Sequence, residues 1–584
     1  MEIVQKRVSV VLIGMSVVAA LLVGQLLSFQ FRLNPSITVF EQNVAAGSTV
    51  TERIAANRGQ ILDRDGVVLA VNSFEYRIGL SPALISPNSR RDVAIEMASI
   101  LNMNEDEIYR HLQPDINQLF PQYVPLAGPV DDQTARALEA LNLDGIIIEP
   151  VALRSYPQGS LTAQLVGFVN YSEEGFYGIE GRYDDQLAGT AREVITDGGL
   201  FNVDEVPEAR DGQSLMLTVD RDIQNAVQQV LTEAIAEHNA AGGTIIVMNP
   251  RTGEILAMQS SPILGPGEFP QPDPETGIVP AYNGAISSQY EPGSVIKVVS
   301  AAIALQAGHA GLDLNWTYNN TGCFMAAGVN ICDWDKVAKG NVTFARCIIE
   351  SLNTCTATWY MNIGVTDVYP RMQEFGFGRP TGIDLEGEAA GTLVLPGDST
   401  WSEANFLNIS YGQGIAATPL QMLVAVNAIA NDGLMMQPHI VKKRIDGNQE
   451  YEILPNPVER PISAEVANAV TDLMVQTLAN GSLDEVASLE GYTIAGKTGT
   501  AQIPINGVYS DTESWASFVG FLPADDPVVS AIIVLDRPDG YWGSATAAPT
   551  FKNLVERLVV LLEIPPDQVR FDLENQGGIP FARN

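Results

Sequence analysis

The chain has 584 residues, too many for one hydrophobic core, so two or three domains are expected. Hydrophobic residues make up 46 % of the sequence, a share typical of a folded protein. The formal net charge of −36, from 69 acidic residues against 33 lysines and arginines, argues strongly against a nucleic-acid partner.

The first element in chain order is an uncharged apolar stretch, residues 8–27, which directly follows a Lys-Arg pair. An apolar helix of this length matches the hydrocarbon core of a bilayer, and flanking positive charges favour the cytoplasmic side. We expect residues 1–7 in the cytoplasm, a single transmembrane anchor over residues 8–29, and the rest of the chain outside. A cleaved signal peptide is the alternative, but the stretch is long for one and lacks a convincing cleavage site.

The next segment, residues 30–215, alternates between extended and helical patterns. Arg58–Ala70 has apolar runs on both sides of an Asp-Gly pair, which predicts a β-hairpin. Residues 88–113 and 131–141 have helical spacing. Three glycines in Glu174–Tyr183 indicate a loop. No cluster of candidate catalytic groups is present, so we expect a non-catalytic spacer or docking domain.

Residues 216–564 are predicted to form a second domain. Strand patterns at both ends of a mainly helical middle, 295–485, predict an α+β domain with one sheet built from both ends. Residues 565–584 are expected to be a loosely held tail. The predicted elements outside the middle are a strand over 215–220, a helix over 222–238, two strands within 243–258, strands over 492–495, 517–522 and 528–535, and a helix over 550–562.

Ser294 and Lys297 lie at the predicted start of a helix. Pro292 and Gly293 end the preceding segment, and an apolar run follows. Residues i and i+3 share a helix face, so the Lys297 ammonium is expected beside the Ser294 hydroxyl. A lysine half removed from water has a lowered pKa and can then serve as a base for a serine nucleophile. The pattern is weak by itself, because serine caps and surface lysines are common.

Two further fragments strengthen this interpretation: Ser351-Leu-Asn353 in the helical middle, and Lys497-Thr-Gly-Thr500 at the end of a predicted strand. Each is common by chance, but the three fragments in this order and at these separations are specific. They supply a nucleophile with its base, a second hydroxyl for proton transfer, an amide for a peptide group, and a cation with hydroxyls for a carboxylate. The sequence therefore predicts a serine acyl-transfer site.

With these motifs the chain resembles the class B penicillin-binding proteins over nearly its whole length. The shared segments are the apolar anchor, Arg58-Gly-x-Ile-x-Asp-Arg-x-Gly66, Arg154-x-Tyr-Pro157, Gly178-Ile-Glu-Gly181, Tyr290-x-Pro-Gly-Ser-x-x-Lys297, Ser351-x-Asn353, Gly412-Gln-Gly414, Thr418-Pro-Leu-Gln421, Ala495-Gly-Lys-Thr-Gly-Thr-Ala-Gln502, Ser517-Phe-Val-Gly-Phe-x-Pro523 and Ala548-Pro549.

The resemblance implies a fold and a location. It implies an extended mixed α/β pedestal of the dimerisation type over residues 30–215. It also implies a transpeptidase domain over 216–564, in which an antiparallel sheet is flanked by helices and joined to a helical subdomain. The location would be a bacterial cytoplasmic membrane. The implied partners are peptidoglycan stem peptides, β-lactams, a polytopic membrane glycosyltransferase and other cell-wall assembly proteins, with no cofactor, metal ion or nucleic acid.

The resemblance also implies roles for site residues. Ser294 would be the acylated nucleophile, Lys297 its general base, and Ser351 a proton shuttle. Asn353 would hold the amide of the donor peptide. The backbone N–H groups of Ser294 and Thr500 would form the oxyanion hole. Lys497, Thr498 and Thr500 are expected to bind the terminal carboxylate of D-Ala-D-Ala or of a β-lactam, and Gly499 is expected beside them among the substrate-binding residues. One departure is Trp515, where relatives often carry a histidine, and we expect it to alter the rim of the cleft and not the reaction.

The four cysteines permit three disulfide pairings. A Cys323–Cys332 bond would brace a short loop near the cleft. A Cys347–Cys355 bond could form across the Ser351–Asn353 fragment if that fragment joins two antiparallel helices. Buried free thiols are the alternative.

Three other site types can be compared with the sequence, and only the first matches a part of it. Gly491–Thr498 fits a phosphate-loop pattern, but residues 492–495 are strand-like where a glycine-rich loop is needed. A Ser-His-Asp hydrolase or a zinc site would need histidines in a suitable context, and none of the four histidines has one. These are His111, His238, His309 and His439.

Two other functions also remain open beside a D,D-transpeptidase: a catalytically dispensable scaffold, and a β-lactam sensor or hydrolase. The sequence does not separate a role in cell division from one in elongation.

Overall fold

The computed structural model describes residues 50–54, 56–113, 123–170, 172–196, 210–272, 279, 281–479, 483–505 and 507–575. The anchor predicted over residues 8–29 and the last part of the expected tail lie outside these residues. Within the described helices, none combines the length and the apolar character needed to cross a bilayer. The chain divides into two units, residues 1–57 with 189–211, and residues 58–188 with 212–584.

The smaller unit contains one described pair of strands. β1 (Val50–Ile54) pairs antiparallel with β8 (Arg192–Thr196), with Val50 opposite Thr196. Nearby, the backbone N–H of Asn57 donates to a carboxylate oxygen of Asp211 at 2.9 Å. This unit thus joins the start and the end of the predicted pedestal.

The larger unit begins with a seven-stranded sheet in the order β20-β19-β9-β2-β3-β4, with β5 also paired to β3. The hairpin predicted over Arg58–Ala70 is confirmed, because β2 and β3 pair antiparallel around a turn in which Asp63 accepts two backbone N–H bonds. The bounds are β2 (Ile61–Leu62), β3 (Val68–Leu80), β4 (Val124–Val130), β5 (Ile146–Ser155), β9 (Ser214–Leu217), β19 (Val441–Asp446) and β20 (Gln449–Glu452).

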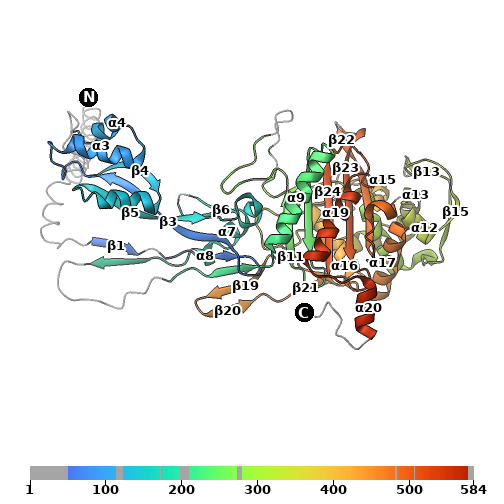
Figure 1. The fold of residues 1–584 in the computed structure, drawn as a ribbon. Helices are drawn as coiled ribbons and strands as arrows, with labels where there is room; N and C mark the ends of the chain where they lie inside the picture. Colours follow the sequence, from blue (N-terminus) through green and yellow to red (C-terminus); the bar gives the residue numbers. More distant parts are fainter. Residues whose placement is uncertain are drawn as a thin grey trace, which may run out of the picture. The chain divides into compact units, whose positions relative to one another are not determined.

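Three helices pack on the β3–β4–β5 part of this sheet (Figure 1). They are α3 (Arg90–Leu101), α4 (Glu105–His111) and α5 (Asp132–Ala140), which confirms the helical spacing noted in the sequence. Their shared core contains Ile78, Val93 and Met97. The N-caps of α4 and α5 are Asn104 and Asp131, whose side chains accept backbone N–H bonds.

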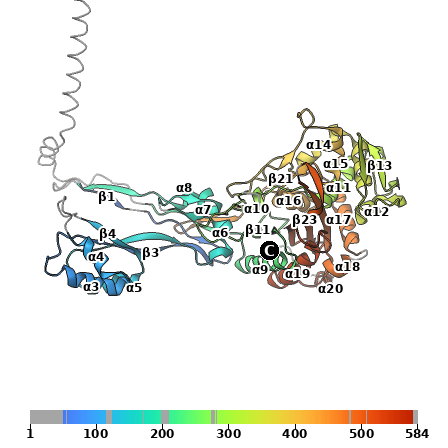
Figure 2. The same cartoon turned by 90° about the horizontal axis from the view of Figure 1, so that it is seen from above.

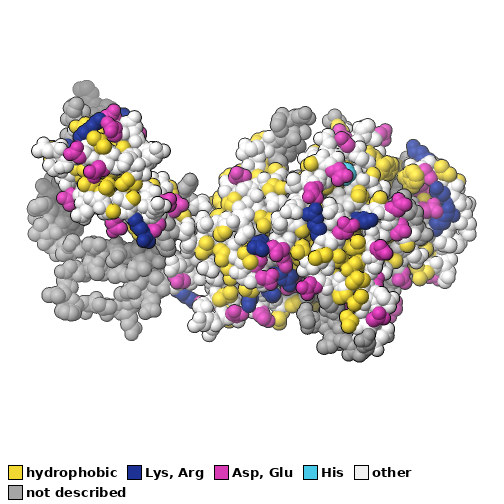
Figure 3. Space-filling view, viewed as in Figure 1, with side chains coloured by type: hydrophobic (Ala, Val, Ile, Leu, Met, Phe, Trp, Pro, Cys, Tyr) yellow, Lys and Arg dark blue, Asp and Glu magenta, His cyan; other side chains and the backbone are white. Residues whose placement is uncertain are grey.

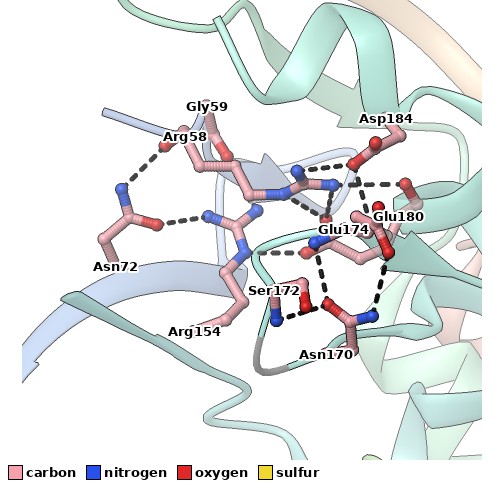
Figure 4. Close-up of polar contacts among 10 residues, drawn as sticks. Arg58, Gly59, Asn72, Arg154, Asn170, Ser172, Glu174, Glu180 and Asp184 are labelled. Atoms are coloured by element: carbon pink, nitrogen blue, oxygen red, sulfur yellow. Dashed lines mark hydrogen bonds and ion pairs between the residues drawn. The ribbon is translucent and has the colours of Figure 1, made fainter. Parts of the chain in front are cut away.

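The prediction of a loop over Glu174–Tyr183 is wrong for most of that segment. β7 (Gly175–Phe176) pairs with β6 (Phe168–Val169), and Gly178–Arg182 form helix α7. The segment is ordered by Glu180, a fully buried carboxylate that pairs with Arg58 at 2.7 Å and Arg154 at 2.7 Å. Figure 4 shows the two guanidinium groups converging on this carboxylate. A buried charge is stable only with such partners, so the glycines here mark a packed helix and not a solvated loop.

The second part of the larger unit is built on a five-stranded antiparallel sheet in the order β11-β10-β24-β23-β22. This order confirms a single sheet made from both ends of the predicted domain. The bounds are β10 (Gly242–Met248), β11 (Ile255–Ser260), β22 (Ala495–Ile505), β23 (Val508–Leu522) and β24 (Val529–Asp536).

Helices cover both faces of this sheet, as Figures 1 and 2 show. On β10, Ile245 and Val247 face a core shared with α9 (Arg221–Glu237) and α19 (Ala547–Leu561). The alternate residues Ile246 and Met248 face the core shared with α11 (Lys297–Ala307), α16 (Pro419–Ala430) and α17 (Ala464–Ala479). Because both faces are buried, β10 and β24 are apolar along nearly their whole length.

The middle of the domain, predicted to be mainly helical, also contains short strands. They pair as β12–β15, β13–β14, β16–β17 and β18–β21. Its helices include α12 (Phe344–Ile349), α13 (Asn353–Ile363), α14 (Val365–Glu374), α15 (Glu403–Asn408) and α18 (Leu483–Ala487). The short helices α6 (Ala163–Val166), α8 (Asp184–Leu187) and α10 (Gly284–Ser287) come before it in the chain. The strand bounds are β12 (Thr317–Asn320), β13 (Cys323–Ala326), β14 (Val329–Cys332), β15 (Gly340–Thr343), β16 (Thr392–Leu393), β17 (Ile415–Ala416), β18 (Met435–Met436) and β21 (Pro457–Glu459).

The expectation of a loosely held tail from residue 565 is wrong for its described part. Residues Asp567–Asn575 form helix α20, and the side chain of Arg570 is buried against the domain. Its guanidinium pairs with Asp525 at 2.6 Å and with Asp567 at 2.9 Å. The pair with Asp525 fixes the helix to the loop between β23 and β24, and the pair with Asp567 lies within the helix.

Candidate active site

Ser294 lies in a short 3₁₀ turn, Gly293–Ile296, that leads directly into α11. The helix start predicted from the sequence is therefore confirmed. Gly293 has φ +55°, and a Cβ atom there would lie 2.8 Å from the carbonyl oxygen of Thr500. Only glycine permits both this backbone conformation and this approach. The turn that carries Ser294 is consequently packed against β22, the strand that carries Thr500.

Lys297, the first residue of α11, is completely buried. Its Nζ donates to the backbone oxygen of Ser351 at 2.6 Å, to Ser351 Oγ at 3.2 Å and to Asn353 Oδ1 at 2.6 Å. Burial, followed by the charge of Lys497, lowers the pKa of Lys297 well below its usual range, while the carboxylate of Asp333 acts in the opposite direction. Lys297 can therefore lose its proton far more readily than a surface lysine.

Lys497 is also buried, and it approaches the same hydroxyl from β22. Its Nζ donates to Ser351 Oγ at 3.1 Å and to the backbone oxygen of Thr498 at 3.2 Å. Burial lowers the pKa of Lys497 to about 8. The hydroxyl of Ser351 thus lies between the amino groups of Lys297 and Lys497, each within hydrogen-bonding distance.

Ser351 owes its position to an unusual backbone conformation. It joins α12 to α13 with φ +56°, in the left-handed region that costs a non-glycine residue free energy. The N–H of Leu352 returns to the carbonyl oxygen of Cys347 at 2.9 Å. A disulfide connects Cys347 to Cys355, so the turn between the two helices is closed covalently.

Asn353 begins α13, and both ends of its amide are occupied. Its Oδ1 accepts from Lys297, and its Nδ2 donates to the carbonyl oxygen of Cys332 at 2.8 Å. Cys332 ends β14 and is disulfide-bonded to Cys323, which begins β13. Both cysteine pairs considered in the sequence are therefore bonded, and each bond braces the Ser351–Asn353 turn.

Residues 497–500 lie within β22, where Lys497 pairs with Val519 on β23. Gly499 is as tightly enclosed as Gly293, because a Cβ atom there would lie 3.0 Å from the carbonyl oxygen of Pro292. The hydroxyl of Thr500 accepts from the N–H of Gly543 at 2.9 Å. Since these residues are in an extended strand with no helix following, the phosphate-loop interpretation of Gly491–Thr498 is wrong.

Other residues singled out in the sequence lie around this cluster or away from it. Trp515 lies on β23 opposite Ala501, and its ring packs 5.9 Å from that of Tyr290. His309 pairs with Asp367 at 3.2 Å. Among the described residues, no hydrogen bond connects this pair to the lysine cluster. Within the described part of the chain, no group of three or more His, Cys, Asp or Glu side chains is arranged to hold a metal ion.

The sequence did not single out Asp333, although this carboxylate is completely enclosed beside the site. It accepts hydrogen bonds from Asn320 and from Thr354, the residue that follows Asn353. A possible signal was its place directly after Cys332, but nothing in the local pattern distinguishes it from a hairpin-end aspartate.

Comparison with known proteins agrees with this geometry. Residues 243–556 match the penicillin binding protein transpeptidase domain, and residues 53–217 match the penicillin-binding protein dimerisation domain. Penicillin-binding protein PbpB of Mycobacterium tuberculosis is 33 % identical over 563 residues, covering 89 % of this chain and 80 % of that protein. The probable peptidoglycan D,D-transpeptidase PenA of Neisseria gonorrhoeae is 27 % identical over 570 residues, covering 96 % and 93 %.

A solved structure gives the same result at the level of the fold. Penicillin-binding protein 3 of Mycobacterium tuberculosis, complexed with ampicillin, has a TM-score of 0.66 and 28 % identity, covering 88 % of this chain and 97 % of that one. The two domain matches, the full-length relatives and the shared fold lead to one conclusion: this chain belongs to the class B penicillin-binding proteins.

Proposed function

We propose that this protein is a peptidoglycan D,D-transpeptidase that cross-links stem peptides through an acyl-enzyme on Ser294. One observation carries the proposal: the hydroxyl of Ser351 lies between two buried lysines, and these come from the Ser294 helix and from β22. Three distant fragments therefore meet where an acyl transfer needs a base, a proton relay and a cation. The domain match and the name of the PenA relative support the same reaction.

The acylation step follows from the depressed pKa of Lys297. In its neutral form Lys297 takes the proton of Ser294 Oγ as that oxygen attacks the carbonyl carbon of the penultimate D-alanine. The peptide C–N bond then breaks. The leaving D-alanine nitrogen gains a proton, which Ser351 can pass on because its Oγ contacts Lys297. An amine of a second stem peptide attacks the ester, releases Ser294 Oγ with its proton, and forms the cross-link.

Substrate binding is assigned to β22 and to the Ser294 turn. Lys497, Thr498 and Thr500 bind the terminal carboxylate, and Gly499 allows the strand to pack closely on the turn. The backbone N–H groups of Ser294 and Thr500 form the oxyanion hole. Because one proton of Asn353 Nδ2 is committed to Cys332, its other proton is the one that can donate to the donor peptide.

The proposal includes a membrane location and an assembly with other cell-wall proteins. Residues 8–29 would anchor the chain in the bacterial cytoplasmic membrane, with residues 1–7 inside and the pedestal, residues 30–215, outside. On the face shown in Figure 3, acidic side chains (magenta) are scattered over the described surface. Together with the net charge of −36, this accords with peptide and protein partners and not with nucleic acid. Glycan polymerisation would come from a polytopic membrane glycosyltransferase.

Labelling with a fluorescent penicillin tests the proposal. The purified protein should form a stable labelled species, and Ser294→Ala should abolish it. Ser287→Ala is the control, because Ser287 lies on α10 and its hydroxyl donates to the Asn283 carbonyl oxygen one turn earlier. Rapid loss of label would identify a β-lactam hydrolase instead, and an unlabelled wild-type protein would favour a scaffold. Incubation with stem-peptide donor and acceptor should then give cross-linked peptide and free D-alanine.

A further inference from the structure

A buried carboxylate, Asp333, lies beside the lysine cluster and has no part in the chemistry proposed above. It follows β14 directly and is 1 % exposed. Aspartate is almost never fully buried unless it is paired or hydrogen-bonded, so its partners must account for it. They connect it to the residues that hold Lys297.

All the hydrogen bonds that Asp333 accepts with its side chain come from two residues of the described structure. Asn320 Nδ2 donates to Oδ2 at 2.6 Å. The backbone N–H of Thr354 donates to Oδ1 at 3.0 Å, and the Thr354 hydroxyl lies 3.1 Å from both oxygens. Thr354 follows Asn353 in the first turn of α13. Asp333 therefore fixes the backbone from which Asn353 reaches Lys297.

The orientation of Asn320 makes this site specific for a carboxylate. Asn320 Oδ1 already accepts from the N–H groups of Gly322 at 3.1 Å and Lys339 at 2.9 Å. Its Nδ2 group is thereby turned toward residue 333, where only an acceptor satisfies it. An amide at position 333 would place one donor against another, at a position with no access to water.

The charge of Asp333 also acts on the site. The charged groups that affect Lys297 are Lys497 on β22, which lowers its pKa, and Asp333, which raises it. The neighbouring Lys339 is engaged with Asp335 at 2.6 Å and with Glu350 at 4.0 Å. Lys336 follows on the same loop, and its N–H bonds to the Asp333 carbonyl oxygen. Asp333 is thus the negative charge that acts on Lys297 against burial and against the charge of Lys497.

We infer that Asp333 is a positioning residue that holds the Ser351–Asn353 turn against Lys297 and keeps a buried negative charge near that lysine. The inference rests on the function proposed above and extends it to a residue outside the three sequence motifs. It requires two separable effects. Loss of the charge should change the pH at which Lys297 becomes active, and displacement of the carboxylate should slow the reaction without changing that pH.

The test measures the rate of acylation by a fluorescent penicillin between pH 5 and pH 9, on the purified full-length protein and three variants. Asp333→Asn removes the charge, Asp333→Glu keeps the charge but moves it by one methylene, and Asp335→Asn removes a neighbouring charge that is paired with Lys339. The low-pH limb of the profile reports deprotonation of the base in the free enzyme. Thermal melting of each variant is recorded alongside.

For Asp333→Asn we expect the low-pH limb to move to lower pH by about half a unit or more, because an opposing negative charge is lost. Asp333→Glu should keep the wild-type midpoint and lower the maximal rate at least about tenfold, as misplaced active-site groups do. Asp335→Asn should change neither quantity. A purely structural role for Asp333 would lower the rate but would not move the low-pH limb in Asp333→Asn while leaving the midpoint unchanged in Asp333→Glu.

A folded Asp333→Asn protein whose low-pH limb does not move overturns the inference. If Asp333→Asn fails to fold, Asp333→Glu decides, and an unchanged maximal rate there overturns it. If the wild-type protein is not acylated at all, the proposed function fails and this inference fails with it. If the wild type is acylated and the variants behave like it, only this inference fails.

Discussion

Replacing Lys497 by methionine should stabilise the protein at neutral pH while removing the cation proposed to bind the substrate carboxylate. Methionine has nearly the same length as the lysine stem and no charge, so it fits the buried position on β22. The gain arises because the folded protein encloses an ammonium group whose pKa has fallen from 10.5 to about 8. Stability and function oppose each other at this residue.

The magnitude follows from that pKa difference. The drop from 10.5 to about 8, at about 1.4 kcal/mol per pKa unit, corresponds to about 3 kcal/mol of unfolding free energy. Below pH 8 both the folded and the unfolded states carry the proton, so the wild-type protein bears this whole cost. Between pH 8 and pH 10.5 the unfolded state binds more protons, and wild-type stability therefore rises with pH. Methionine also loses two hydrogen bonds, worth about 1 kcal/mol each.

Equilibrium unfolding in guanidinium chloride, followed by tryptophan fluorescence at pH 7 and at pH 10.5, measures both terms. We expect Lys497→Met to be about 1 kcal/mol more stable than wild type at pH 7 and about 2 kcal/mol less stable at pH 10.5. Lys552→Met is the matched control, because the Lys552 ammonium bonds a backbone oxygen at the surface. A difference between Lys497→Met and wild type that stays constant across this pH range would refute the reasoning.

Three further predictions concern other parts of the molecule. Replacing Cys323 and Cys332 together by serine should lower the unfolding free energy by about 2 kcal/mol and slow penicillin labelling, because the hairpin that holds Asn353 loses its covalent bond; labelling at the wild-type rate would contradict this. Gly499→Ala should reduce the labelling rate at least about tenfold, since the new Cβ atom would lie 2.4 Å from Ser517 Oγ; a normal rate would show that β22 shifts freely. Glu180→Gln should cost about 3 kcal/mol or more in unfolding free energy, as two guanidinium groups lose their buried carboxylate; a melting temperature equal to that of wild type would exclude this role.

Much of the fold could be predicted because its signals are local. The apolar runs of β10 and β24 and the amphipathic pattern of α9 each identify one element without reference to the rest of the chain. The site could be predicted equally well, because Ser294 and Lys497 lie in short motifs whose order along the chain is specific. What local patterns could not give was the contact between Ser351 Oγ and both lysines, which depends on the packing of three distant elements.

The errors share a physical cause, because each involves a residue whose partner is far away in sequence. Glu180 turned an apparent loop into a helix through arginines 122 and 26 positions away. Arg570 turned an apparent tail into a docked helix through Asp525. Asp333 was not predicted as a residue of the site, because its partner Thr354 is 21 residues downstream. A buried ion pair or polar cluster has no periodicity along the chain, so no sequence pattern predicts it.

The two active-site lysines can serve opposite purposes only if they titrate at different pH values. Lys297 must be neutral to take a proton from Ser294, whereas Lys497 must be charged to hold a carboxylate. Burial lowers the pKa of both groups: that of Lys297 lies well below its usual range, and that of Lys497 falls to about 8. Because interacting groups lose their protons one after the other, we expect Lys297 to lose its proton first while Lys497 keeps its own. Acylation should therefore be fastest between the two pKa values and should fall about fivefold from pH 8 to pH 9, as Lys497 loses its charge. Lys497→Arg, which keeps the charge at all these pH values, should abolish that fall, and a decline of the same size in this variant would remove Lys497 from carboxylate binding.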